Sequence, residues 1–227
     1  MKLAARRGET RERIIDAAGA VFAERGFRGT TIRQITARAG VNLAAVNYYF
    51  RDKNELYVQV LKEAKRHVPL VAVPEPAGKP EAQLRVLVDR FVRSLLDPRR
   101  PFWHGRVLMS EMSNPTPALG VLIRDVTAPF YHKMQSLIGE IVGGAASPAK
   151  LDLLTLSVMG QCIFYVCSRP VIEQLALDLG RAPNRTDWIA HHVGDFSVAA
   201  LRDFRRRASK KPRPGSRSRQ QHSIRHE

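Results

Sequence analysis

The chain has 227 residues, 44% hydrophobic and 26% charged, so it is long and apolar enough to bury a sizeable core. Its two cysteines, Cys162 and Cys167, have a spacing that fits neither a zinc site nor a CxxC redox pair. Both lie in an apolar helical run, where a free cysteine usually behaves as a small hydrophobic residue. The first residues turn polar before an apolar segment develops, so we expect no signal peptide and a reduced, cytoplasmic protein.

The formal net charge of +16 is distributed unevenly along the chain. Residues 1–67 contribute +7 and residues 204–227 contribute +8, whereas residues 68–203 contribute only +1. A basic segment beside a nearly neutral one indicates a polyanionic partner for the first and a different task for the second.

The first expected helix follows a basic arm at residues 1–9 that we expect to be mobile. Thr10 can cap this helix, and Gly26 can end it by adopting a positive φ. Phe27 should then insert beneath the next helices. The apolar residues of the helix recur at three- and four-residue spacing, at Ile14, Ala17, Ala18, Val21 and Phe22.

The stretch from Thr31 to Lys53 predicts two short helices joined by a tight turn. Thr31 and Gln34 form a capping box, Gly40 stops the first helix, and Asn42 can cap the second. The inner face of the second helix should consist of Val46, Tyr49 and Phe50. Asp52 and Glu55 open a further helix to about residue 67. Helix, glycine turn, helix is the unit that places its second helix in the DNA major groove.

Prolines between residues 69 and 80 break regular structure and predict a domain boundary. Helical periodicity then continues, and no segment alternates between apolar and polar residues as a strand does.

Residues 151–167 are too interrupted by polar residues for a membrane span, so we expect a buried core helix. The basic, Pro- and Ser-rich end should be disordered. The expected helices are 83–96, 102–112, 117–142 with a kink at Pro129, 148–169, 170–179 and 187–206.

Four motifs together resemble the DNA-binding domain of the TetR family of bacterial transcriptional regulators. They are Ala-Gly-x-x-Phe-Ala-Glu-Arg-Gly-Phe at 18–27, Thr-Thr-Ile-Arg-Gln-Ile at 30–35, Ala-Gly-Val at 39–41 and Tyr-Tyr-Phe-x-x-Lys-x-Glu-Leu at 48–56. Weaker similarity from Phe102 to Ile141 and beyond resembles the C-terminal domain of the CecR-like subgroup.

The resemblance implies an all-α fold and a homodimer. The expected parts are an N-terminal three- or four-helix bundle with the helix-turn-helix at 1–67, a helical effector-binding and dimerisation domain at 68–207, and a basic tail at 208–227. The helices at 148–168 and 187–206 would form the dimer interface. The partners implied are a double-stranded DNA operator and a small-molecule effector, with no membrane and no cofactor.

The exposed face of the helix-turn-helix should contact DNA. By position and by resemblance, Arg33 can pair with a guanine edge, Asn47 with adenine, and Leu43 or Ala44 can touch a thymine methyl group. Arg33 can equally contact a phosphate, and Asn47 can be structural. Many family members carry Leu-Tyr-x-His-Phe where this chain has Val46 to Phe50, so the resemblance implies no operator sequence. The remaining expected contacts, mainly to phosphates, are Thr31, Asn42, Tyr48, Tyr49 and Lys53.

An effector pocket is expected in the nearly neutral domain, where aromatic and methionine side chains recur at helical spacing. The same spacing is typical of an ordinary core. The candidate lining residues are Phe102, Trp103, Met109, Met112, Phe130, Met134, Phe164 and Tyr165.

The sequence therefore predicts a ligand-responsive repressor, with two alternatives. A sequence-non-specific basic DNA-binding protein fits the net charge and the tail. An α-helical enzyme has little support, because the chain contains no phosphate-binding glycine loop, nucleophile elbow or HExxH motif. His191 lies four residues from both Asp187 and Asp195, but we interpret these residues as a polar helix face and expect no metal site.

Overall fold

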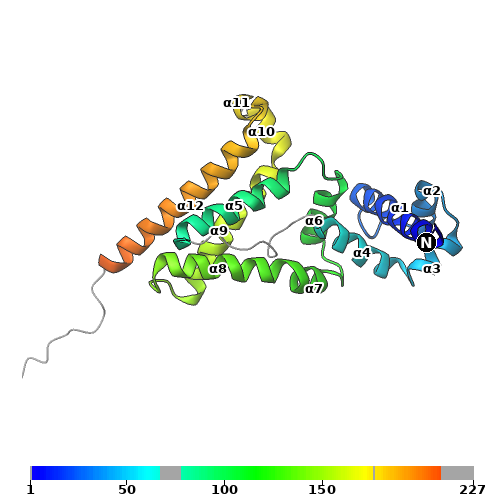
Figure 1. Cartoon of the computed structure of the whole chain (residues 1–227), viewed down its shortest axis with the longest axis horizontal. Coiled ribbons are helices and arrows are strands. Elements are labelled where there is room, and N and C mark those ends of the chain that lie inside the picture. Colours follow the sequence, from blue (N-terminus) through cyan, green and yellow to red (C-terminus); the bar gives the residue numbers. More distant parts are fainter. Residues whose placement is uncertain (1, 67–77, 176, 211–227) are drawn as a thin grey trace, which may run out of the picture.

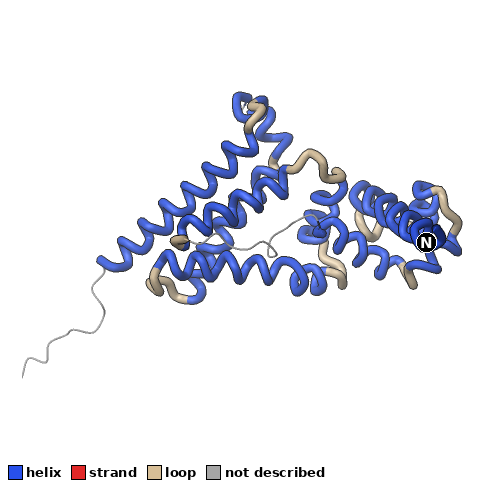
Figure 2. Tube along the Cα trace, viewed as in Figure 1, coloured by secondary structure: helices blue, strands red, loops and turns tan. Residues whose placement is uncertain are grey.

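The computed structural model describes residues 2–66, 78–175 and 177–210, and these residues form helices without any strand (Figures 1 and 2). The molecule is elongated, with the N-terminal helices at one end and the long C-terminal helix along the other (Figure 1). The expected all-α fold is confirmed. The predicted proline boundary at 69–76 and residues 211–227 of the predicted tail lie outside the described residues. Residues 208–210, which were predicted to belong to the tail, are helical.

Four helices form the N-terminal end. Helix α1 begins at Lys2, so the prediction that this helix starts at Thr10, after an arm at residues 1–9, was wrong. Residues 2–7 include Ala and Arg, which favour a helix, and the single Gly8 weakens a helix by only about 1 kcal/mol, which is too little to stop it. The four helices are α1 (Lys2–Arg25), α2 (Ile32–Ala39), α3 (Leu43–Tyr49) and α4 (Lys53–Arg66).

Aromatic side chains organise the core of this bundle. The Phe22 ring lies edge-on to the Tyr57 ring at 4.8 Å, and the Phe27 ring lies 4.8 Å from the same tyrosine. Phe27 is half-buried and packs against the core, as expected for a residue that closes the base of the bundle.

The second part of the chain contains the remaining helices, and α5, α8, α9 and α12 surround its core. Helix α12 extends to Lys210, past the predicted end near residue 206. The bounds are α5 (Pro80–Leu96), α6 (Trp103–Ser113), α7 (Leu119–Leu122), the π-helical segment η1 (Ile123–Thr127), α8 (Ala128–Val142), α9 (Pro148–Cys167), α10 (Arg169–Leu175), α11 (Leu177–Arg181) and α12 (Arg185–Lys210).

The predicted helix kink at Pro129 takes the form of a π-helical turn. The Ala128 N–H donates to the carbonyl of Ile123, five residues earlier, instead of the usual four. Pro129 has no N–H, so it cannot donate to the carbonyl of Asp125, four residues before it. The ammonium group of Lys65 on α4 donates to that carbonyl at 2.6 Å. The irregular turn therefore provides a contact between the two parts of the chain.

Helix α9 is only half buried, which corrects the expectation of a buried core helix. Thr155, Val158, Met159 and Cys162 form its buried face, while large apolar side chains on the opposite face are exposed. Among the described helices, α9 alone has the length and hydropathy of a membrane-spanning helix, and such a helix can equally belong to a soluble protein. An apolar run in a sequence cannot distinguish burial within one subunit from burial against a second molecule.

Candidate nucleic-acid interface

The helix-turn-helix is held by the caps that the sequence predicts. The Gln34 N–H donates to the Thr31 hydroxyl at 3.3 Å, and the Thr31 N–H donates to the Gln34 side-chain oxygen at 2.8 Å, which completes the capping box. Gly40 adopts φ 63° and ψ 40°, a conformation that a side chain would strain. The Ala45 N–H donates to the Asn42 side chain at 2.8 Å and starts α3. These contacts fix the angle between α2 and α3.

Buried side chains hold α3 against the bundle and leave its other face in solvent. Val46 and Phe50 are 1% and 2% exposed, and Ile35 and Ala39 of α2 are buried beneath them. The predicted DNA-contacting residues differ in how far they are buried. Tyr49 and Lys53 are half-buried; Thr31, Arg33, Asn42, Leu43, Ala44, Asn47 and Tyr48 are exposed.

Arg33 is available for a partner outside the chain. It is exposed, and within the described residues its guanidinium group makes no hydrogen bond or ion pair. By contrast, Arg38 on the same helix pairs with Glu24 at 2.7 Å. The free guanidinium beside the exposed face of α3 can therefore reach a base edge or a phosphate.

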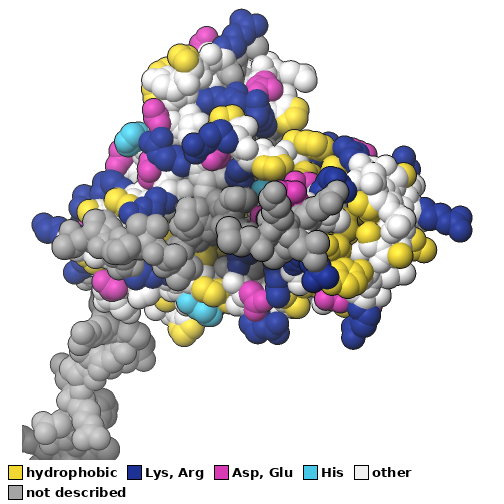
Figure 3. Space-filling model, turned by 45° about the vertical axis from the view of Figure 1, so that its right-hand side comes forward, with side chains coloured by type: hydrophobic (Ala, Val, Ile, Leu, Met, Phe, Trp, Pro, Cys, Tyr) yellow, Lys and Arg dark blue, Asp and Glu magenta, His cyan; other side chains and the backbone are white. Residues whose placement is uncertain are grey.

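The start of α1 lies against the end of α3. The Arg7 guanidinium carbon lies 5.8 Å from the centroid of the Tyr48 ring, and that of Arg11 lies 5.6 Å from the Phe50 ring. Arg11 also donates to Gln59 at 2.9 Å. Because α1 is helical here, it positions Arg7 beside the exposed face. In Figure 3, Lys and Arg side chains project from this end of the molecule.

Lys53 has a structural role that its sequence motif did not indicate. Its ammonium group donates to the carbonyls of Phe27 at 3.0 Å and Thr30 at 2.9 Å and lies 4.4 Å from the Phe27 ring centroid. It thereby closes the turn between α1 and α2. A lysine has three donors, so one remains for a phosphate.

Asp52 caps α4, as predicted. The Glu55 N–H donates to its carboxylate at 2.8 Å, and this backbone hydrogen bond lowers the pKa of Asp52 below its ordinary value. The Glu55 carboxylate accepts from the N–H of Arg51 rather than from that of Asp52, at 3.0 Å. Helix α4 therefore begins directly after the helix-turn-helix and connects it to the rest of the molecule.

Helix α6, from the second part of the chain, packs into the core of the first. Trp103, Val107 and the nearby Ala118 are buried together with residues of α1 and α4. The indole of Trp103 covers Gly19 of α1 so closely that a Cβ atom there would lie 2.4 Å from the ring. The packing therefore joins the two parts of the chain firmly at this point.

A buried hydrogen-bonded carboxylate lies at the same contact. Glu111 of α6 is fully buried and accepts from the Tyr57 hydroxyl of α4 at 2.9 Å. It also accepts from the N–H and the hydroxyl of Thr116, at 2.9 and 3.0 Å. Burial, reinforced by the negative charge of Glu111, raises the pKa of Tyr57. Movement of α6 is therefore linked to α4 through a polar contact that water does not reach.

The eight predicted effector-lining residues differ in burial and lie in different parts of the fold. Trp103 belongs to the N-terminal core, and Phe130 and Met134 are buried in the other core. Tyr165 lines a cavity of about 20 Å³, too small for an effector. Of the rest, Met109 is half-buried, and Phe102, Met112 and Phe164 are exposed.

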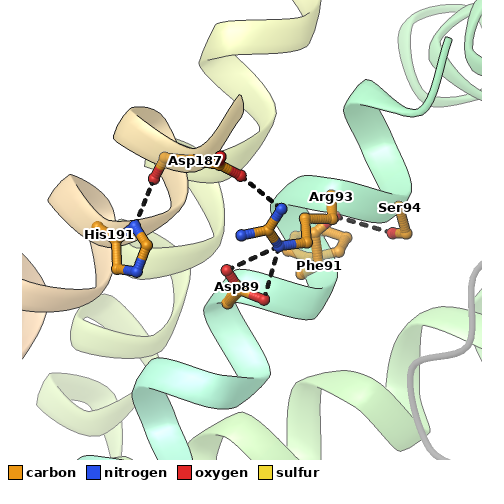
Figure 4. A network of polar contacts seen from close by, with 6 residues as sticks. All are labelled: Asp89, Phe91, Arg93, Ser94, Asp187 and His191. Atoms are coloured by element: carbon orange, nitrogen blue, oxygen red, sulfur yellow. Dashed lines mark hydrogen bonds and ion pairs between the residues drawn. The ribbon is translucent and has the colours of Figure 1, made fainter. Parts of the chain in front are cut away.

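The residues around His191 form a polar helix face. The Asp187 carboxylate accepts from Arg93 at 2.6 Å, and the Asp195 carboxylate accepts from Arg85 at 2.6 Å. The Nδ1 atom of His191 faces the backbone carbonyl of Asp187 at 2.8 Å (Figure 4). Both carboxylates are therefore directed at α5, and no metal-binding group of three such residues occurs among the described residues.

The sequence reasoning missed an arginine-lined pocket at the end of α5. It is lined by Arg90, Arg93, Arg99 and Arg100, among others. Two features of the sequence indicate it. Arg90 and Arg93 are three residues apart and so share a helix face, and Pro98-Arg99-Arg100-Pro101 places two more arginines in the turn that follows. The nearly neutral charge of residues 68–203 concealed this local concentration.

A capped helix-turn-helix with an exposed second helix, attached to a larger helical body, defines a DNA-binding protein of the helix-turn-helix class. Comparisons with known proteins identify its family. Residues 14–60 match the family model described as bacterial regulatory proteins, tetR family, and residues 80–203 match that of the C-terminal domain of the HTH-type transcriptional dual regulator CecR. The chain belongs to the TetR family of bacterial transcriptional regulators and is not an enzyme.

Individual relatives agree with this assignment. The chain is 28% identical to the dual regulator CecR of Shigella flexneri over 72% of this chain and 78% of that protein. It is 27% identical to the transcriptional repressor NicS of Pseudomonas putida over 85% of this chain and 92% of that protein. The crystal structure of the TetR-family regulator PfmR from Thermus thermophilus has the same fold, with a TM-score of 0.59, 14% identity and coverage of 82% and 97%.

Proposed function

We propose that this protein is a cytoplasmic, ligand-responsive repressor that binds a pseudo-palindromic operator as a homodimer. The observation that carries the proposal is the exposed outer face of α2 and α3, where Arg33 and Asn47 are both in solvent. In a dimer, two such faces enter successive major-groove turns about 34–36 Å apart, or a multiple of that distance. Repression is favoured by the similarity to NicS, itself a repressor.

Dimerisation is supported by exposed apolar side chains on α9 and α12. Leu153, Leu156 and Phe164 follow each other at helical spacing on α9, and each is more than half exposed. Trp188 and Phe196 occupy the outer face of α12, at 53% and 56% exposed. The two helices pack against each other within the subunit. Exposed apolar side chains on two neighbouring helices suit an interface with a second copy of the chain.

The oligomeric state tests this surface directly. Leu156→Arg should convert the protein to a monomer in sedimentation, because a charge would be buried in the interface. Leu175→Arg is the matched control, since Leu175 is 81% exposed and lies on α10, outside the surface. A dimer that survives Leu156→Arg, or one that Leu175→Arg disrupts equally, would contradict the proposed interface.

Effector response is proposed to operate through differential affinity. The effector would bind the C-terminal helices and favour a state in which the two recognition helices are misplaced on the operator. The contact of Trp103 with Gly19 leads to α1, and that of Glu111 with Tyr57 leads to α4, so such a change can reach the N-terminal bundle through both.

DNA binding is tested by gel-shift titration against the DNA flanking the protein's own gene. We expect tight binding to one fragment at moderate salt and weak binding to scrambled DNA of the same length. Equal affinity for both, with a steep salt dependence, would instead establish a sequence-non-specific DNA-binding protein.

The role of Asn47 has a separate test. Asn47→Ala should relax the preference at one base step in each half-site, by about 1–3 kcal/mol. Asn184→Ala is the control, because it removes the same exposed side chain just before α12. Selection of bound fragments from a random pool measures the preference. An operator profile that Asn47→Ala leaves unchanged would mean that this residue is structural.

A further inference from the structure

A wide pocket opens where α5 ends. Its volume is about 790 Å³, within the range of small-molecule sites. Its walls come from the last turns of α5, from the turn leading to α6 and from the first turn of α12. The lining residues are Arg90, Arg93, Ser94, Leu96, Asp97, Pro98, Arg99, Arg100, Pro101 and Thr186.

The lining is strongly basic. Its lining contains four arginines and a single acidic residue, Asp97. This concentration is local, since residues 68–203 together carry a net charge of only +1. A planar guanidinium can hold a carboxylate or a phosphate with two parallel hydrogen bonds, which makes arginine suited to recognising such groups.

Two of the four arginines are already held by carboxylates of the protein. Arg93 donates to Asp89 at 2.9 Å and to Asp187 at 2.6 Å, and so ties α5 to α12 (Figure 4). Arg99 donates twice to Asp97, at 3.0 Å. These pairs shape the wall of the pocket and leave little charge to attract a ligand.

The other two arginines make no ion pair among the described residues. The guanidinium group of Arg90 also makes no hydrogen bond there. Arg100 donates to the backbone carbonyls of Ser94, at 2.8 Å, and Ala64, while its Nε is buried and has no partner among the described residues. Burial also lowers the pKa of Arg100, although the negative charge of Asp97 acts in the opposite direction.

We propose that this pocket binds a small organic anion whose carboxylate or phosphate group is held by Arg90 and Arg100. The apolar part of the ligand would contact Leu96, Pro98 and Pro101, which line the same pocket. The acidic group would pair with two guanidinium groups that make no ion pair among the described residues. The carboxylate whose charge acts on Arg100, that of Asp97, is already hydrogen-bonded to Arg99.

The position of Arg100 also connects the pocket to the DNA-binding end. Its Nη2 donates to the carbonyl of Ala64 in the last turns of α4, the helix that follows the helix-turn-helix. A ligand that draws this guanidinium away removes a hydrogen bond from α4. This consequence rests on the proposed function, whereas the binding of an anion does not.

Binding is measured by isothermal titration calorimetry on the full-length protein without DNA. The probes are 1-naphthoate, 1-naphthyl phosphate and the neutral 1-naphthamide. We expect at least one of the anions to bind at least about tenfold more tightly than the amide, and the stronger anion identifies the head group. Equal affinity for all three probes, or no binding of either anion at about 1 mM, would overturn the proposal.

Variants test which arginines bind the anion. Arg90→Gln should weaken anion binding about tenfold and leave amide binding unchanged. Arg106→Gln removes the same charge from an exposed position on α6, outside the lining, and should leave both affinities unchanged. Arg100→Lys, which keeps the positive charge but loses the planar fork, should also weaken anion binding. Anion affinity that survives Arg90→Gln, or falls equally in Arg106→Gln, would refute the site.

The two proposals fail separately. A protein that binds naphthoate through Arg90 but shows no preference for its flanking DNA keeps the anion site and loses the proposed function. A protein that binds its operator but distinguishes no anion from the amide keeps the function and loses the anion site.

Discussion

Replacing Gly19 by alanine should destabilise the protein, although alanine is the better helix former. Gly19 lies within α1, and a Cβ atom there would fall 2.4 Å from Cδ2 and Cε3 of Trp103 and 2.6 Å from its Cε2. These are rigid ring atoms of a side chain that is only 3% exposed, so no flexible group can move aside. Either α6 or the indole must shift.

The size of the effect follows from two opposing terms. Overpacking a buried site costs about 1–3 kcal/mol, and contact with three ring atoms places this site in the upper part of that range. Alanine regains about 0.5–1 kcal/mol over glycine inside a helix. The net loss is therefore about 1–2 kcal/mol, or a fall in Tm of about 2–8 °C for a chain of this size.

Gly8→Ala on the same helix provides the control with the opposite sign. A Cβ atom added at Gly8 would meet no other atom within 4 Å, so alanine there should stabilise α1 by up to about 1 kcal/mol. Urea unfolding at one fixed protein concentration measures both variants, because the stability of the proposed dimer would depend on concentration. Gly19→Ala as stable as the wild type, with an unchanged m value, would refute the reasoning.

A double-mutant cycle identifies the source of the effect. Trp103→Phe removes ring atoms nearest to Gly19, so Gly19→Ala should cost less in that background than in the wild type. Strictly additive effects would mean that the loss arises elsewhere in α1.

Three further predictions concern the contacts around the helix-turn-helix and α4. Tyr57→Phe deprives the buried Glu111 carboxylate of a hydrogen-bond donor and should lower the free energy of unfolding in urea by about 1–3 kcal/mol. Tyr131→Phe, at a more exposed site, should lower it by less, and equal losses in the two variants would contradict this prediction. Thr31→Ala removes the cap of α2 and should cost about 1 kcal/mol, while Thr31→Ser should restore most of it; equal stability of the two variants would exclude the capping role. Burial lowers the pKa of Lys65 from 10.5 to about 8. Between about pH 8 and 10 the unfolded chain therefore binds more protons at this site than the folded protein does. As the pH rises through this range, the wild type should gain stability relative to Lys65→Met. Parallel pH profiles of unfolding for these two proteins would show that Lys65 is not perturbed.

Local chemistry let the sequence determine the DNA-binding unit. The capping box of Thr31 and Gln34, the Gly40 turn and the Asn42 cap involve neighbours in the chain, so their geometry follows from residue type and spacing alone. The all-α class followed equally from periodicity. Local signals also misled at the N-terminus, where Thr10 was expected to begin a helix that already runs from Lys2.

Tertiary structure decided what spacing along one helix cannot express. Only packing between distant helices places Trp103 on Gly19, Lys53 on the α1–α2 turn and Arg100 on the last turns of α4. The effector candidates were chosen as apolar residues at helical spacing, and helix offsets distributed them between two cores and the surface. Apolar periodicity marks a face that must be buried, but the partner that buries it is determined by the arrangement of whole helices.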